Sequence, residues 1–154
     1  ALQYKDGPTA LILSRQNLPF QTRDQAQIDD IVKGGYVLAK EKGELKAIII
    51  ATGSEIDLAM QAHAELEGVR VVSMPCAELF MQQDATYREA VLPSNIRARV
   101  AVEAAHVDYW WKFVGLDGKV IGMTTYGESA PAKDLFNHFG ITKQAVVDAV
   151  NSLS

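Results

Sequence analysis

The run Lys46-Ala47-Ile48-Ile49-Ile50-Ala51-Thr52 constrains the fold of this chain more than any other feature. A strand that is apolar on both faces belongs inside a parallel sheet covered by helices on both sides. Apolar residues then recur at helical spacing over residues 56–66, with Ser54 as the expected N-cap. A second apolar run at residues 69–74 completes a β-α-β unit, for which a right-handed parallel crossover is expected.

The rest of the chain continues this alternation of strands and helices. Strands are predicted at residues 98–103 and 119–123, and helices at residues 77–92, 107–114 and 131–140 and after Thr142. Ser129 and Thr142 are the expected N-caps of the last two helices. Residues 36–40 should pair antiparallel with the next strand, because only a brief hairpin-like turn at residues 41–44 joins the two. The predicted fold class is therefore α/β, a three-layer α/β/α domain with a mostly parallel sheet and one antiparallel strand.

The N-terminal part follows a different pattern. A β-prone apolar run at residues 9–14 ends in the polar sequence Ser14-Arg15-Gln16-Asn17. The following residues are polar and aperiodic, apart from one helical turn expected near residues 27–32. We therefore expect residues 1–17 to be the last strand of a preceding domain, residues 18–33 to be a linker, and residues 34–154 to be the α/β domain.

Composition excludes several function classes. The 154 residues carry a formal net charge of −4 without a basic stripe, so a nucleic-acid partner is not expected. No apolar stretch is long enough to span a bilayer, so a membrane partner is not expected either. Cys76 is the only cysteine, which excludes an internal disulfide and a cysteine-based zinc cluster and is typical of the reducing cytosol. We interpret it as a structural residue.

Arg15 is the strongest candidate for a functional side chain. It follows an apolar strand-like run, and the carboxyl ends of strands are where α/β proteins bind ligands. Its planar guanidinium can grip a phosphate or carboxylate with two hydrogen bonds. The alternative is a surface ion pair with an acidic residue such as Asp24.

Two other candidates have simpler structural interpretations. Thr52-Gly53-Ser54-Glu55 joins a strand to a helix, but it lacks the glycine pattern of a dinucleotide fold and the lysine of a phosphate loop, so a helix cap is favoured. Glu103 and His106 could form an acid–base pair. Their spacing of three residues in a turn favours a cap and a surface residue instead.

The aromatic cluster Tyr109-Trp110-Trp111 with Phe113 could be a stacking platform. Consecutive residues on a helix point in different directions, so only part of this set can line one face. Core or interface packing is therefore favoured over a cofactor site. Because one tryptophan of the pair would otherwise be exposed, a covered interface is plausible.

Seven motifs occur in the order found in one enzyme family. They are Ser14-Arg15-Gln16-Asn17-Leu18-Pro19, Gly34-Gly35-Tyr36-Val37-Leu38, Ile50-Ala51-Thr52-Gly53-Ser54-Glu55, Val71-Val72-Ser73-Met74-Pro75, Tyr87-Arg88-Glu89-Ala90-Val91-Leu92-Pro93, Asp108-Tyr109-Trp110-Trp111-Lys112-Phe113-Val114-Gly115 and Tyr126-Gly127-Glu128-Ser129-Ala130-Pro131. Over essentially its whole length the chain resembles the C-terminal end of bacterial-type transketolase. Ala105 and His106 depart from the family pattern, where glycine and an apolar residue are usual, so the resemblance gives His106 no role.

The resemblance implies a cytoplasmic, homodimeric transferase of the pentose phosphate pathway that moves a two-carbon ketol unit between phosphorylated sugars. It implies thiamine diphosphate and Mg2+ (or Ca2+) in the parent enzyme, both held by N-terminal domains whose motifs this chain lacks. Residues 1–17 would end the pyrimidine-binding domain, and Arg15 would contact the substrate phosphate. The segment itself would bind no cofactor or metal, carry no catalytic residue and be inactive alone.

Two other interpretations stay open. One is a small-ligand-binding or regulatory α/β domain without catalysis, which would use the loops at residues 52–54 and 124–129. The other is a separately encoded half-enzyme that works with a partner chain.

Overall fold

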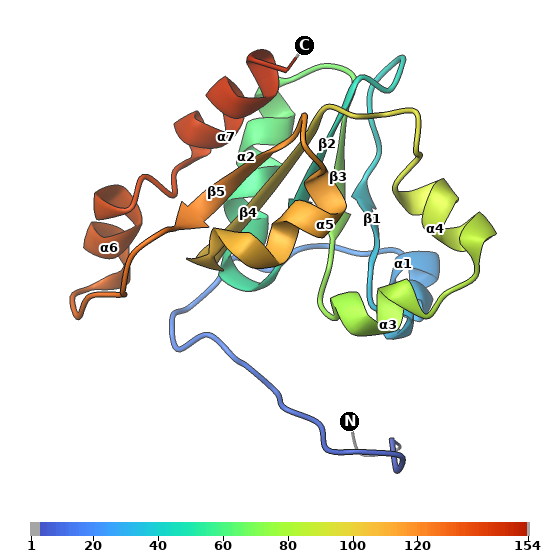
Figure 1. Ribbon diagram of the computed structural model, residues 1–154, viewed down its shortest axis with the longest axis horizontal. Coiled ribbons are helices and arrows are strands. Elements are labelled where there is room, and N and C mark those ends of the chain that lie inside the picture. The colour runs from blue at the N-terminus through green and yellow to red at the C-terminus, as the bar shows by residue number, and fades with distance from the viewer. Residues whose placement is uncertain (1–3, 154) are drawn as a thin grey trace.

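The computed structural model describes residues 4–153, which form a five-stranded sheet in the order β1-β3-β2-β4-β5 (Figure 1). The strands are β1 (Tyr36–Ala39), β2 (Ala47–Ala51), β3 (Val69–Ser73), β4 (Arg99–His106) and β5 (Lys119–Met123). Strand β2 pairs in parallel with β3 and β4, and β5 pairs in parallel with β4, whereas β1 is antiparallel to β3. The mostly parallel sheet with one antiparallel strand confirms the predicted fold class.

Helices cover both faces of the sheet (Figure 1). One core joins the sheet to α2 (Ile56–Glu65) and α7 (Lys143–Asn151), and the other joins it to α3 (Ala77–Met81), α4 (Ala85–Val91) and α5 (Trp111–Val114). Within β2, Ile49 belongs to the first core and Ile48 and Ile50 to the second. This alternation explains why the strand is apolar on both faces.

Strand β1 was predicted to pair with β2 through a hairpin, and that prediction is wrong. The direction is antiparallel as expected, but Tyr36 lies opposite Ser73 of β3. The reason is that β2 already has parallel neighbours on both sides. Strand β1 is therefore an edge strand, and its outer side is covered by Gln27 of α1 (Gln25–Asp30), whose side-chain amide donates to the carbonyl oxygens of Val37 and Leu38 at 3.0 and 2.7 Å.

Two of the three predicted serine and threonine caps are wrong. Ser54 lies inside a 3-10 turn, η2 (Gly53–Glu55), and its hydroxyl donates to the Glu55 side chain instead of capping α2. Helix α6 (Ala132–His138) begins after Pro131, whose fixed φ suits a helix start, so Ser129 lies outside it. Thr142 does cap α7, since its Oγ1 accepts from the Ala145 N–H at 3.2 Å.

The predicted strand at residues 9–14 does not form. These residues are extended but exposed, and no strand lies beside them within residues 4–153 (Figure 1). A strand needs a hydrogen-bonded neighbour, and an apolar run without one gains nothing from β geometry. Their lack of a partner, not their composition, explains the difference.

The remaining predicted helices form, but with bounds that differ from the predicted ones. Residues 77–92 form the two helices α3 and α4, and residues 107–114 form η3 (Val107–Trp110) followed by α5. The turn expected near residues 27–32 is α1 followed by η1 (Ile31–Lys33).

Candidate functional site

The order of the sheet strands defines where a ligand site is expected. The chain passes from β2 to β3 on one side and later places β4 on the other side of β2. In open α/β sheets, ligands bind outside the carboxyl ends of the strands at such a reversal. Two carboxyl residues lie at this point, Glu55 just after β2 and Glu103 within β4.

Protein groups already occupy the carboxyl of Glu55. The residue is only 3% exposed, and the Ser54 hydroxyl donates to its Oε1 at 2.6 Å. Burial raises the pKa of Glu55 above its ordinary value, and the nearby Glu103 raises this pKa further, against the lowering effect of the Ser54 hydrogen bond. Glu55 therefore contributes to packing at the reversal point, with its carboxyl held by the Ser54 hydroxyl.

Glu103 and His106 are not arranged as an acid–base pair. The Glu103 Oε2 accepts a hydrogen bond from the indole N–H of Trp110 at 2.7 Å. The His106 ring is more than half exposed, and its Nδ1 accepts from the Asp108 N–H at 3.4 Å at the start of η3. Within residues 4–153 no hydrogen bond joins Glu103 to His106. His106 is both the N-cap of η3 and exposed, whereas Glu103 is half-buried in β4 and caps no helix, so the predicted turn with one cap and one surface residue is only partly correct.

The aromatic cluster divides between core and surface. Trp110 is 2% exposed and packs against Phe113 at 5.7 Å between ring centroids, whereas Trp111 is 44% exposed. The Tyr109 hydroxyl donates to Glu78 at 2.7 Å, and the same carboxylate accepts a long contact of 3.8 Å from the Cys76 thiol. The tyrosine hydrogen bond is the main cause that lowers the pKa of Glu78. These contacts join α3 to η3, and Cys76 lies at the residue before α3.

Arg15 lies in the exposed N-terminal segment. Among residues 4–153 no hydrogen bond or ion pair involves its guanidinium. The alternative partner Asp24 is used elsewhere, since its carboxylate caps α1 by accepting the Gln27 N–H at 2.8 Å. The alternative interpretation of Arg15, an ion pair with Asp24, is therefore absent among residues 4–153, and the Arg15 side chain is exposed.

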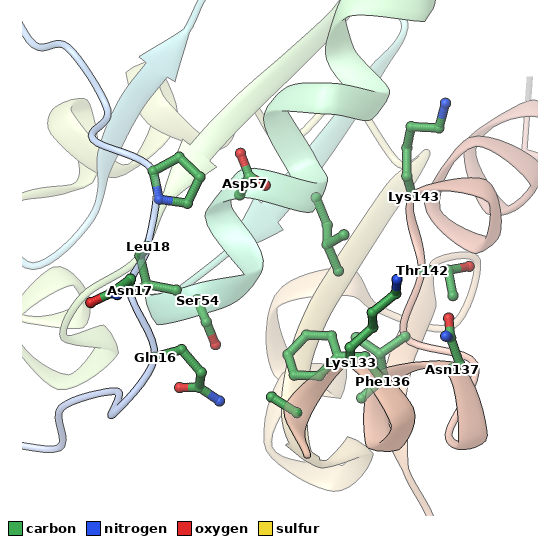
Figure 2. A pocket seen from close by; sticks show the side chains of 14 residues that line it. Gln16, Asn17, Leu18, Ser54, Asp57, Lys133, Phe136, Asn137, Thr142 and Lys143 are labelled. Carbon is green, nitrogen blue, oxygen red and sulfur yellow. The ribbon is translucent and has the colours of Figure 1, made fainter.

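A cavity of about 430 Å³ opens beside this segment, and sequence reasoning did not identify it (Figure 2). Its walls come from three parts of the chain: residues 16–19, the start of α2, and α6 with the start of α7. Figure 2 shows Gln16 and Ser54 on one side and Lys133 and Phe136 on the other. Because these segments are distant in sequence, no local motif could have indicated the cavity.

The described residues also bear on metals and membranes. Within the described residues, no group of three or more histidine, cysteine, aspartate or glutamate side chains is arranged to hold a metal ion. No helix within residues 4–153 has the length and apolarity to cross a membrane.

Comparisons with known proteins identify relatives of this chain. A family model for the transketolase-like C-terminal domain matches residues 34–142. Transketolase 2 of Vibrio vulnificus is 55% identical over 157 residues, which cover 99% of this chain and 24% of that protein. The chain thus spans about a quarter of the length of this relative.

Solved structures agree with the sequence match. The transketolase from Leishmania mexicana superposes with a TM-score of 0.81 at 39% identity, over 90% of this chain and 20% of that chain. A transketolase from Pichia stipitis, solved in complex with sedoheptulose-7-phosphate, gives a TM-score of 0.77 at 30% identity over the same shares. The chain therefore belongs to the transketolase family, and its residues 34–142 match the C-terminal domain of that family.

Proposed function

We propose that the chain forms the C-terminal region of a transketolase, an enzyme that transfers a two-carbon ketol unit between phosphorylated sugars. The observation that carries the proposal is 55% identity to a bacterial transketolase over 99% of this chain. When bound, thiamine diphosphate would supply the electron sink for the carbanion chemistry. It and its divalent metal would be held by other domains, whose diphosphate-binding motif does not occur in this chain.

Arg15 would supply binding energy for the phosphate of the sugar and no chemistry. Three observations support this role: the side chain is exposed, it has no partner within residues 4–153, and it lies in the motif Ser14-Arg15-Gln16-Asn17. The Pichia stipitis relative binds a sugar phosphate. An arginine fork suits a terminal phosphate because it donates two parallel hydrogen bonds.

We further propose the division of the chain into residues 1–17, 18–33 and 34–154. Residues 1–17 would complete the sheet of the pyrimidine-binding domain, which accounts for the exposed side chains of Leu11, Ile12 and Leu13 here. The linker contacts the domain at Arg23, whose side chain donates to the Tyr36 hydroxyl at 2.6 Å. Residues 34–154 would support a cytoplasmic homodimer.

The test is a chimera in which this chain replaces the matching segment of Transketolase 2 of Vibrio vulnificus. Arg15→Ala should raise the KM for sedoheptulose 7-phosphate about 10- to 100-fold, as expected for one lost charge-assisted contact, with little change in kcat. With sedoheptulose, which lacks the phosphate, KM should not change. The matched control is Arg97→Ala, which removes an exposed arginine that pairs with Asp117 on the domain surface.

Unchanged kinetics of the Arg15→Ala chimera would refute the role of Arg15. The unmodified chimera tests the family role, which requires turnover there. The chain alone, mixed with thiamine diphosphate, Mg2+ and a pair of sugar phosphates, should give no turnover, and turnover there would contradict its assignment as a non-catalytic segment.

A further inference from the structure

The cavity of about 430 Å³ lies at the carboxyl edge of the sheet, the edge at which α/β proteins bind ligands. Ser54 and Asp57 follow β2, and Lys133 lies on α6, which follows β5. The volume is within the range of small-molecule sites, roughly 300–1,000 Å³. Arg15 does not line the cavity, and the function proposed above makes no use of it.

The floor of the cavity is apolar. Leu58 of α2, Phe136 of α6 and Ile141 before α7 all line it, and Ile141 is 1% exposed. Leu58 and Phe136 are half-buried, so each keeps some apolar surface uncovered. A ligand with an apolar body would remove this surface from water, the main driving force for binding in such sites.

The charged side chains around the cavity indicate which ligand charge it can accommodate. Lys133 makes no ion pair within residues 4–153, whereas the Lys143 ammonium is engaged by Glu65 at 2.5 Å. Asp57 also lines the cavity, and its carboxylate accepts from Gln61 on its own helix at 2.7 Å. The cavity is therefore lined by one lysine without an ion pair among residues 4–153 and by one aspartate. This balance accommodates a single negative charge near Lys133 and disfavours a dianion, because Asp57 would repel the second charge.

The wall opposite Lys133 offers neutral hydrogen-bonding groups. Gln16, Asn17 and Ser54 line it, and Figure 2 shows Gln16 and Ser54 facing the side that carries Lys133 and Phe136. These groups can orient a carboxylate without neutralising it. We propose that the cavity is a binding site for a small organic monocarboxylate whose apolar body lies on Phe136 and Leu58 and whose carboxylate pairs with Lys133.

The test is isothermal titration calorimetry of this chain with 2-naphthoate, a monoanion with an apolar body. We expect a Kd on the order of 1 mM or below, because a ligand of this size gains only a modest binding free energy per non-hydrogen atom. The neutral analogue 2-naphthylmethanol and the small anion acetate should each bind at least about fivefold more weakly, because each lacks one of the two contacts. Naphthyl phosphate, a dianion above pH 7, should also bind more weakly.

Two variants and a matched control locate the binding. Lys133→Met should weaken 2-naphthoate binding about fivefold. Ala132→Phe, at a cavity-lining position on α6, should abolish it by filling the space. Lys42→Met changes an exposed lysine away from the cavity and should leave the Kd unchanged. Circular dichroism checks that each variant is folded.

Three outcomes would overturn the proposal. They are no heat of binding with 2-naphthoate, equal affinity for 2-naphthoate and 2-naphthylmethanol, and binding that survives both Lys133→Met and Ala132→Phe. None of them depends on transketolase activity, so failure here leaves the role of Arg15 unaffected.

Discussion

Two apolar runs of similar composition differ completely in their burial. Ile48, Ile49 and Ile50 of β2 are completely buried, whereas Ile12 is 96% exposed and Leu13 81% exposed. The first run has a neighbouring strand on each side and helices over both faces, and the second has neither. An apolar run therefore predicts only that a partner is needed. Whether the partner lies within the same chain depends on topology.

Two arginines show the same contrast. Arg15 is exposed and unpaired among residues 4–153, while Arg99 is half-buried and holds four backbone carbonyls. The Arg99 guanidinium donates to the carbonyl oxygens of Ile96, Phe113, Leu92 and Pro93 at 2.8 to 3.2 Å. Arg99 thus stabilises the fold, and Arg15 is available to another molecule.

The largest expected difference separates the two runs. Ile50→Ala should lower the free energy of unfolding by about 2–5 kcal/mol, because it leaves a cavity in a fully buried strand. Ile12→Ala should change it by less than about 0.5 kcal/mol, since that side chain already contacts water. Urea denaturation of both variants measures this. Equal losses would mean that residues 9–14 are packed in solution and would remove the contrast.

The second difference separates the two arginines. Arg99→Met should cost about 2–4 kcal/mol of unfolding free energy, because partly buried carbonyls near the end of α4 lose their donors. Arg15→Met is the matched control and should be neutral within about 0.5 kcal/mol. The same denaturation experiment applies, and a neutral Arg99→Met would show that water replaces the guanidinium.

The smallest effect is a pair of opposite pH dependences. Burial raises the pKa of Glu55, so its favourable contribution is complete below the unfolded value of 4.5 and is lost as the pH rises through the raised value. The Arg70 guanidinium, which pairs with Glu41 at 2.8 Å, lowers the pKa of Glu41. The contribution of Glu41 is therefore present above 4.5 and is lost as the pH falls.

Gln variants measure these slopes. Relative to Glu55→Gln, the parent chain should lose stability as the pH rises above 4.5, by at most about 1.4 kcal/mol per pH unit. Relative to Glu41→Gln, the parent should lose stability as the pH falls below 4.5. Thermal unfolding over a pH series gives both differences. Slopes of the same sign would show that Glu55 is hydrated in solution.

The sequence predicted those features that depend on residues close together in the chain. The apolar runs at residues 47–51 and 69–73 and the Thr142 cap could be predicted because each depends on residues nearby in the chain. The sequence alone could not exclude a hairpin between β1 and β2. The true neighbour of β1, the strand β3, was decided by which edges β2 left available.

The site features that sequence reasoning missed all depend on distant segments. The cavity combines residues 16–19 with α2 and α6. The backbone carbonyls that accept hydrogen bonds from Arg99 come from residues 92–96 and from Phe113. Ser54 is a reasonable N-cap by residue type, but the 3-10 turn and the buried Glu55 redirect its hydroxyl. Residue type predicted a hydrogen bond there, and packing selected its acceptor.

Hydrogen exchange tests the central claim most directly, which is that residues 9–14 and Arg15 belong to a site completed by other domains. The measurement compares amide exchange at residues 9–14 and 47–51 in this chain and in the Vibrio vulnificus chimera. Residues 47–51 should be protected in both proteins, whereas residues 9–14 should exchange at unprotected rates in the chain and at least about 100-fold more slowly in the chimera. Equal exchange of residues 9–14 in the two proteins would contradict the account.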